Sequence, residues 1–216
     1  MTCCCPHSKS GGRIFSLFAR SYKKRFSKKG FEPSQQQLMA GLEQAGYKNS
    51  TLLEVGSGVG YLHQVLLEQG ATSAVGIDFS QEMLTEASNW AAEKNLTERT
   101  TYIQGDFIEL LDKVEPADVT ILDKVVCCYP FAELLVNSSI TKTKKVYALS
   151  YPRKRWFIQT TVACSAFFLK LIGSSFRPYV HNPKDIEKWI CEKGFKKTHQ
   201  QQTFIWLTQI YESETR

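Results

Sequence analysis

A glycine-rich loop constrains the fold of this chain more than any other feature of the sequence. The apolar run Thr51–Val55 is typical of a strand, and the loop at residues 54–60 (EVGSGVG) overlaps its end. Glycines at positions 56, 58 and 60 permit a tight turn and let the backbone approach a ligand closely. Residues 59–68 then have helical spacing, which places a helix N-terminus and its unpaired N–H groups beside the loop. The loop therefore predicts a strand–turn–helix unit that binds a carboxylate or a phosphate.

The rest of the chain predicts alternating strands and helices. Ser80 followed by Glu82 is typical of a helix N-terminus. Alternation of this kind favours an α/β fold, with a doubly wound, Rossmann-like, mostly parallel sheet. The predicted strands are 51–55, 73–79, 100–104, 117–126 and 145–151, the predicted helices 59–68, 80–94, 131–139, 156–172 and 183–193, and the predicted C-terminal antiparallel hairpin 197–203 and 204–212.

The formal net charge of +6 is concentrated at the N-terminus. Residues 1–30 contain eight of the 27 Lys and Arg residues and no acid, which leaves 19 basic against 21 acidic residues in 31–216, a net charge of −2. We therefore expect a basic N-terminal arm over 1–30 and a single domain over 31–216. A slightly acidic domain argues against a broad nucleic-acid-binding face.

Aromatic residues of the arm are spaced as one face of a helix. Phe15, Phe18, Tyr22 and Phe26 stand at i, i+3, i+7 and i+11, with basic residues around them. A cap helix folded over a ligand pocket is the favoured interpretation. Peripheral contact of residues 13–29 with an anionic membrane and binding of nucleic acid are the alternatives.

Cysteine usage and apolar runs predict a cytoplasmic protein. The start of the chain lacks a secretory signal pattern, and the odd total of seven cysteines leaves at least one free thiol. The runs Cys3–Cys5 and Cys127–Cys128 lack the spacing of zinc sites, so no metal is predicted. Residues 156–172 form an interrupted apolar stretch that falls short of a bilayer span. We expect a buried or half-buried helix there that covers the carboxyl edge of the sheet, with Phe167 and Phe168 in the core.

The spacing of the glycine loop distinguishes two cofactor classes. Dinucleotide-binding loops have the spacing G-x-G-x-x-G, which the loop 54–60 does not match. Its E-x-G-x-G-x-G spacing resembles motif I of the class I S-adenosylmethionine-dependent methyltransferases. Asp78 ends the second predicted strand, and Gly105-Asp106-Phe107 follows the third, as in that family. The resemblance covers residues 45–151 firmly.

This resemblance implies S-adenosylmethionine as the cofactor. An acid at Asp78 would accept hydrogen bonds from the ribose hydroxyls. Asp106 would contact the adenine amino group, and Phe107 would lie against the adenine ring. The residues predicted to bind the cofactor are Glu54, Gly56, Gly58, Gly60, Asp78, Phe79, Asp106, Phe107 and Asp123.

The methyl acceptor is expected at the loop after the fourth strand, because open α/β sheets bind ligands outside the carboxyl ends of their strands. The loop lacks the N/D-P-P-Y signature that some DNA and protein methyltransferases use on amino groups. Its DKVVCCYP segment (123–130) is similar to a group of small methyltransferases classed with magnesium-protoporphyrin O-methyltransferases. Tyr129 and His181 are predicted as catalytic, and Tyr129, Arg153 and Arg177 as substrate-binding, since arginines clamp carboxylates and histidine serves as a general base.

These observations predict a cytoplasmic S-adenosylmethionine-dependent methyltransferase that acts on a small molecule by in-line displacement. The alternative is a membrane-associated or thiophilic-metal-binding protein that retains the fold without turnover.

Overall fold

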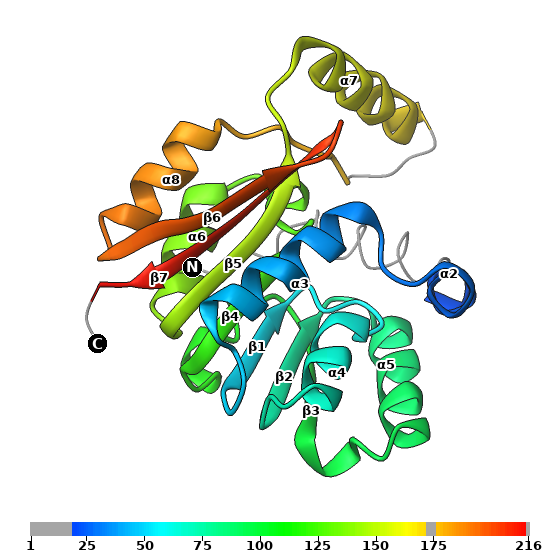
Figure 1. Cartoon of the computed structure of the whole chain (residues 1–216). Coiled ribbons are helices and arrows are strands. Elements are labelled where there is room, and N and C mark those ends of the chain that lie inside the picture. The colour runs from blue at the N-terminus through cyan, green and yellow to red at the C-terminus, as the bar shows by residue number, and fades with distance from the viewer. Residues whose placement is uncertain (1–18, 172–175, 215–216) are drawn as a thin grey trace.

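The computed structural model describes residues 19–171 and 176–214, and within them it shows a mostly parallel sheet with helices on both faces (Figure 1). Phe15 and Phe18 of the predicted aromatic stripe, and the cysteines Cys3–Cys5, lie outside the described residues. The described strands form one seven-stranded sheet in the order β3-β2-β1-β4-β5-β7-β6. Their bounds are β1 Thr51–Val55, β2 Ser73–Asp78, β3 Thr100–Gln104, β4 Ala117–Asp123, β5 Thr143–Pro152, β6 Phe195–Gln202 and β7 Trp206–Ser213.

The strand order reverses next to β1, and this reversal positions the site. From β1 the chain moves outward to β2 and β3, and then returns to β4 on the other side of β1, with parallel pairing throughout. The loops that leave β1 and β4 therefore diverge on opposite faces of the sheet. Such a divergence opens a crevice at the carboxyl ends of the strands, where α/β proteins bind ligands.

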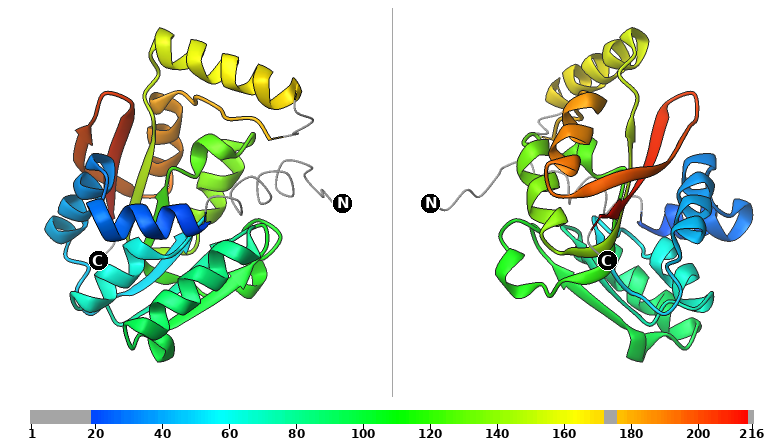
Figure 2. Two further views of the ribbon diagram at one scale, coloured as in Figure 1. Left: turned by 90° about the vertical axis from the view of Figure 1, so that its right-hand side faces the viewer. Right: turned by 60° about the vertical axis from the view of Figure 1, so that its left-hand side comes forward.

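The helices cover the two faces of the sheet unequally. Helices α3 (Pro33–Ala45), α4 (Tyr61–Glu68) and α5 (Gln81–Glu93) pack on one face, and α6 (Ala132–Ile140) and α8 (Pro183–Cys191) on the other (Figure 2). The first core contains Leu38, Leu42 and Leu66, all fully buried. The second core includes Leu135 and Ile186. Three short 3-10 turns complete the connections, at Thr97–Arg99, Leu111–Lys113 and Val126–Cys128.

The predicted α/β class, parallel sheet and C-terminal hairpin are confirmed, with shifted boundaries. The fourth strand ends at Asp123, because Lys124 adopts a left-handed conformation with φ of 60° and turns the chain out of the sheet. The predicted strand over 117–126 is therefore three residues too long. The hairpin has its turn at residues 203–205, so its second strand begins two residues later than predicted.

Helix α3 is absent from the prediction, although its start carries a local signal. Glu32 is the N-cap, Pro33 occupies the first turn, and Glu32 and Gln35 form a capping box. Gly41 lets the helix approach β7 closely, because a Cβ there would lie 2.5 Å from Ile210 Cγ1. Helix α3 thus completes the face of the sheet over β5 and β7.

Helix α7 (Trp156–Leu171) contradicts the predicted buried or half-buried helix. Ile158 is its one buried side chain, whereas Phe167 and Phe168 are 60% and 66% exposed. The apolar composition predicts burial against the sheet, but the helix stands clear of both helical layers (Figures 1 and 2). The first turn of α7 contacts the rest of the domain, through the buried Ile158 and through the Phe157 ring, which stacks on Phe204.

Candidate functional site

A cavity of about 360 Å³ lies at the carboxyl ends of the central strands. It falls where the strand order reverses, as the topology predicts. Helix α2 (Ala19–Lys29) borders it through Tyr22, Arg25 and Phe26. Its volume is in the range of small-molecule and cofactor sites. Of the residues predicted to bind the cofactor, the cavity is lined by Glu54, Gly56, Gly58, Asp78, Phe79, Asp106, Phe107 and Asp123.

The glycine loop shapes the floor of this cavity, and its glycines differ in their roles. All three have positive φ values: 67° at Gly56, 53° at Gly58 and 74° at Gly60. A Cβ at Gly56 would collide with Val125, and one at Gly60 would lie 2.8 Å from the His63 ring. A Cβ at Gly58 would meet no atom within 4 Å. Gly56 and Gly60 therefore permit close packing, whereas Gly58 leaves the cavity open.

Backbone N–H groups hold the Asp78 carboxylate at the cavity. Gly58 N donates to Asp78 Oδ2 at 2.8 Å, and Ser80 N donates to Asp78 Oδ1 at 2.9 Å. Burial raises the pKa of Asp78, and the backbone hydrogen bonds oppose that rise. A carboxylate has about four lone-pair directions, so acceptor capacity remains for a ligand.

Asp106 is positioned by Tyr129 from the loop after β4. The Tyr129 hydroxyl lies 3.0 Å from both Asp106 carboxylate oxygens, and Ile108 N donates to Oδ1 at 3.0 Å. Both side chains are buried and line the cavity. The hydrogen bond therefore places Tyr129 beside Asp106 and the adjoining Phe107.

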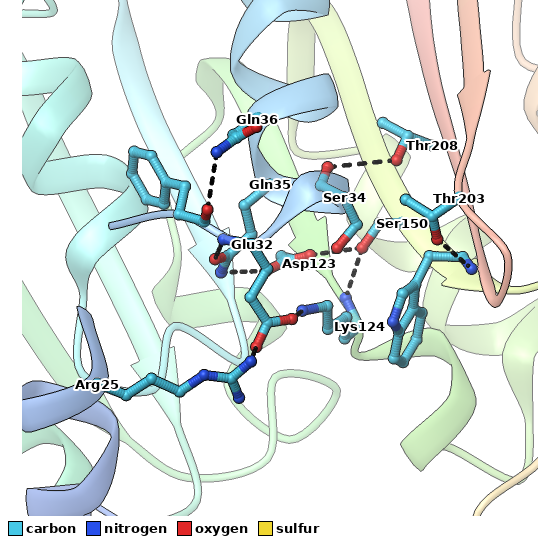
Figure 3. Close-up of polar contacts among 12 residues, drawn as sticks. Arg25, Glu32, Ser34, Gln35, Gln36, Asp123, Lys124, Ser150, Thr203 and Thr208 are labelled. Carbon is cyan, nitrogen blue, oxygen red and sulfur yellow. Dashed lines mark hydrogen bonds and ion pairs between the residues drawn. The ribbon is translucent and has the colours of Figure 1, made fainter. Parts of the chain in front are cut away.

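Asp123, at the end of β4, is held by two neighbouring elements. Gln35 Nε2 of α3 donates to Asp123 Oδ2 at 2.8 Å, and Ser150 Oγ of β5 donates to Oδ1 at 2.5 Å (Figure 3). The missed helix α3 therefore supplies a direct contact to a residue predicted from the loop alone.

An ion-pair chain joins α2 to the loop after β4. Arg25 Nη2 lies 2.6 Å from Glu32 Oε1, and Lys124 Nζ lies 2.5 Å from Glu32 Oε2 (Figure 3). Lys124 Nζ is also 5.1 Å from the centre of the Trp206 ring, within cation–π range. Burial acts to raise the pKa of Glu32, but the hydrogen bond and charge of Lys124, with Arg25, lower it overall. We call Arg25, Glu32 and Lys124 the latch.

Aromatic rings hold the other side of α2. Phe26 stacks on Tyr61, the first residue of α4, with ring centres 4.2 Å apart and planes 10° apart. Phe31 and Trp90 pack edge-on against Phe26 at 4.9 and 5.7 Å. The described part of the predicted aromatic stripe thus faces the domain at the cavity.

A buried polar network lies beneath the glycine loop. His63 Nδ1 is 2.6 Å from Glu54 Oε2, and His63 Nε2 is 3.0 Å from the Tyr102 hydroxyl. Gln64 Nε2 also donates to that hydroxyl at 2.8 Å. Burial raises the pKa of Glu54, and the hydrogen bond and charge of His63 oppose the rise. The network orients Glu54, which lines the cavity.

The two predicted substrate arginines are not among the described residues that line the cavity. Arg153 Nη1 donates to the Thr203 carbonyl at 2.9 Å, which ties β5 to the hairpin turn. Arg177 Nη1 donates to the Phe176 carbonyl at 2.6 Å. Their predicted role in binding a substrate stays a prediction.

His181 also lies outside the cavity lining of the described chain. Its Nε2 donates to the Tyr129 carbonyl at 3.1 Å. Burial lowers the pKa of His181, against opposing hydrogen bonds to the carbonyls of Tyr129 and Val126. The catalytic roles of His181 and Tyr129 stay predictions; in this structure His181 contacts the loop that carries Tyr129.

Several residues that line the cavity are not among those predicted from the sequence. Their signals were the capping box at Glu32 and Gln35, and the position of Lys124 in the loop already singled out. Trp206 carried no signal, because the start of a hairpin strand reaches the site only through the tertiary fold. The missed residues that line the cavity include Glu32, Gln35, Lys124, Met83, Leu135 and Trp206.

The lining fits a cofactor that carries positive charge and hydroxyl donors. Five carboxylates line the cavity (Glu32, Glu54, Asp78, Asp106 and Asp123), against the cations of Arg25 and Lys124. A sulfonium or ammonium group suits such surroundings. Two lining residues, Ser57 and Tyr61, also have buried hydroxyls without a hydrogen-bond partner in the described chain. Among the described residues, no group of three or more His, Cys, Asp or Glu side chains is arranged to hold a metal.

Comparison with known proteins identifies a family to which the chain is similar. A family model described as "Methyltransferase domain" matches residues 47–201, which is more than half of the chain. No curated protein is similar enough in sequence to count as a match.

Solved structures with the same fold share little sequence with this chain. Magnesium protoporphyrin IX methyltransferase from Synechocystis PCC 6803, with bound SAH, has a TM-score of 0.69 at 20% identity over 93% of this chain and 98% of that one. An S-adenosylmethionine-dependent methyltransferase from Mesorhizobium loti has a TM-score of 0.63 at 13% identity over 82% and 96%. The [4+2]-cyclase SpnF has a TM-score of 0.70 at 11% identity over 95% and 96%. At these identities the likeness establishes the fold.

Proposed function

The chain belongs to the methyltransferase domain family, and on that premise we propose that it transfers the methyl group of S-adenosylmethionine to a small-molecule acceptor. One observation supports a small molecule as the acceptor. A single cavity is lined both by the predicted cofactor-binding residues and by Tyr22, Lys124 and Trp206, under helix α2. An acceptor in that cavity is enclosed by the protein, which suits a small molecule better than a nucleic acid or a folded protein.

Residues at the ends of β1, β2 and β3 would hold the cofactor. Asp78 has the acceptor capacity for ribose hydroxyls, and Asp106 for the adenine amino group. We propose that Tyr129 is a positioning residue, because its hydroxyl orients the Asp106 carboxylate. Glu54 and Asp123 would face the positively charged sulfonium and ammonium groups of the cofactor.

When bound, the cofactor supplies a methyl group already activated on a sulfonium. The chain therefore has to align the acceptor and exclude water. We propose that α2 is the cap that excludes water, as the aromatic stripe predicts. The latch and the Phe26–Tyr61 stack hold this helix over the cavity.

The proposed acceptor end lies between the latch and the hairpin. Lys124, Trp206 and Tyr22 line it, with the Cys128 thiol nearby. A flat or carboxylate-bearing molecule would find a ring and a cation there. As in the predicted arginine clamp, a cation would bind a carboxylate of the acceptor, but here the cation is Lys124.

Transfer of a labelled methyl group tests this function. Purified protein and methyl-labelled S-adenosylmethionine are incubated with a low-molecular-mass cell extract, with total RNA, and with total protein. We expect label only in small molecules. Label in RNA or protein alone would contradict the acceptor class, and failure to bind S-adenosylhomocysteine in calorimetry would contradict the cofactor assignment.

No observation favours the alternative in which the chain keeps the fold but has lost turnover. The described residues carry free thiols at Cys127, Cys128, Cys164 and Cys191. Free thiols suit the reducing cytoplasm that we propose as the compartment. A thiophilic-metal site that joined Cys127 and Cys128 to Cys3–Cys5 would include residues that lie outside the described part of the chain.

A further inference from the structure

Helix α7 exposes apolar side chains that the proposed function does not use. Its 16 residues are mostly apolar, with Gln159, Thr160, Thr161, Ser165 and Lys170 as the polar exceptions, yet Ile158 is its one buried side chain. A helix with this composition is ordinarily buried in protein or in lipid. The exposed apolar side chains of α7 and of the hairpin turn beside it, which we call the α7 patch, are Trp156 (76% exposed), Phe167 (60%), Phe168 (66%), Leu171 (65%), Phe204 (69%) and Ile205 (44%).

The charges around the patch all have one sign. Residues 153–182 include Arg153, Lys154, Arg155, Lys170 and Arg177 and contain no Asp or Glu. Lys154, Arg155 and Lys170 are exposed. Three of these cations precede the N-terminus of α7, where the helix dipole disfavours positive charge. Their position therefore does not stabilise the helix and suits an anionic partner.

The side-chain hydroxyls of Thr160, Thr161 and Ser165 in α7 are bonded within the helix. Thr160 Oγ1 donates to the Trp156 carbonyl at 2.9 Å, and Thr161 Oγ1 donates to the Phe157 carbonyl at 2.8 Å. Ser165 Oγ donates to the Val162 carbonyl, also at 2.8 Å. Hydroxyls bonded in this way can enter an apolar phase without losing a partner. Lys170 has a long stem that lets its ammonium reach back to the polar surface.

The dimensions of α7 suit a helix that lies in a membrane surface. Its 16 residues span about 24 Å, less than the roughly 30 Å of a hydrocarbon core. Among the described residues no helix is long and apolar enough to cross a bilayer. Trp156 at one end is of the residue type found at membrane–water boundaries.

We propose that the α7 patch docks the protein on an anionic lipid surface, with the phenylalanines of α7 in the acyl boundary and Lys154, Arg155 and Lys170 at the lipid headgroups. A second copy of this chain fits less well. Both ends of α7 are basic, so side-by-side pairing of two copies would bring cations together. The proposal differs from membrane contact through residues 13–29, and it does not depend on which molecule is methylated.

The patch connects to the proposed acceptor end of the cavity. Phe157, in the first turn of helix α7, stacks on Phe204 of the hairpin turn, with ring centres 4.9 Å apart. The hairpin turn leads directly into Trp206, which lines the cavity. The hairpin turn therefore lies between the proposed lipid surface and the site.

Vesicle binding by the full chain tests the proposal. Co-sedimentation is measured with phosphatidylcholine vesicles that contain or lack phosphatidylserine. We expect binding to the anionic vesicles, weakened by added NaCl because salt screens the surface charges. Absence of binding to anionic vesicles at low salt would overturn the proposal.

Two pairs of substitutions locate the surface. Lys154→Glu with Arg155→Glu should weaken binding by roughly 30-fold or more, at about fivefold for each basic residue lost. Lys193→Glu with Lys196→Glu is the matched control, because both lysines are exposed and lie just before and at the start of β6, at the end of the hairpin away from its turn. It should weaken binding far less.

Phe167→Ser with Phe168→Ser should weaken vesicle binding at least about tenfold, since both rings would leave the acyl boundary. Binding of S-adenosylhomocysteine serves as the check of folding and should not change. Vesicle binding that survives both sets of α7 substitutions but is lost in Lys24→Glu with Lys28→Glu would place the contact in α2 and overturn the proposal.

Two further measurements separate insertion from other contacts. Brominated lipids should quench the fluorescence of Trp156 on docking, and the quenching should disappear in Trp156→Phe. A concentration-dependent dimer in ultracentrifugation that Phe167→Ser with Phe168→Ser dissociates, without lipid binding, would assign the patch to a second copy and overturn the proposal.

Discussion

At the scale of single residues, the carboxylates around the cavity are held by neighbouring donors. Asp78 is bonded to two backbone N–H groups, Asp106 to Tyr129, and Asp123 to Gln35 and Ser150. Such contacts fix each carboxylate before a ligand arrives, which lowers the ordering cost of binding.

Asp78→Ala should weaken binding of S-adenosylhomocysteine by roughly 10- to 150-fold, because hydrogen bonds to a charged group are worth about 1.5–3 kcal/mol. Calorimetry measures the loss. Asp112→Ala, at an exposed carboxylate away from the cavity lining, is the matched control and should bind normally. Equal affinities in the two variants would contradict the role of Asp78.

Gly56→Ala should lower the free energy of unfolding more than Gly46→Ala does. Both glycines have positive φ, 67° and 81°, so both variants carry backbone strain. The added methyl at Gly56 also collides with Val125, whereas at Gly46 it meets no atom within 4 Å. Urea unfolding should show an extra loss of about 1–3 kcal/mol at Gly56. Equal losses would show that Val125 yields freely.

At the scale of elements, helices α2 and α3 close the site that the strands open. Helix α3 places Gln35 on Asp123, and the capping residue of the same helix, Glu32, joins the latch. Neither contact was predicted, since the range 33–45 is rich in glutamine and was not assigned to a helix. The capping box was the overlooked signal.

Glu32→Gln should loosen α2 and lower the free energy of unfolding by about 1 kcal/mol at neutral pH. The latch lowers the pKa of Glu32 from its usual 4.5, so the ionised latch stabilises the fold above that value. This contribution is lost as the pH falls through the lowered pKa. The difference between wild type and variant should therefore be complete above about pH 5 and vanish in stronger acid.

Urea titrations at several pH values measure this difference, and hydrogen exchange of the α2 amides locates it. Gln36→Glu, at an exposed position on the same helix, controls for a change of charge. A difference that persists unchanged in strong acid would show that the latch is not ionic.

At the scale of the whole molecule, two separate cores cover the faces of one sheet, and the cavity lies at the edge where they meet. The ligand therefore contacts loops from β1, β2, β3 and β4 together with the cap helix. Binding at such a junction stabilises the folded state as a unit.

S-adenosylhomocysteine at 100 times its dissociation constant should stabilise the fold by about 2.7 kcal/mol, which for a chain of this size raises Tm by roughly 5–10 °C. Thermal unfolding measures the shift. NAD at the same concentration should leave Tm unchanged, because the glycine spacing differs from the dinucleotide pattern. A larger shift with NAD would contradict the cofactor assignment.

The sequence by itself determined the α/β class and the glycine loop, and it singled out Glu54, Asp78, Asp106 and Asp123, which line the cavity. Those features are local, because adjacent residues determine a strand, the turn that follows it and the start of the next helix. The tertiary structure alone decided that Lys124, Trp206 and Glu32 share one cavity and that Phe167 and Phe168 are exposed. Composition shows that a segment is apolar, but only the packing of distant elements shows whether protein covers it.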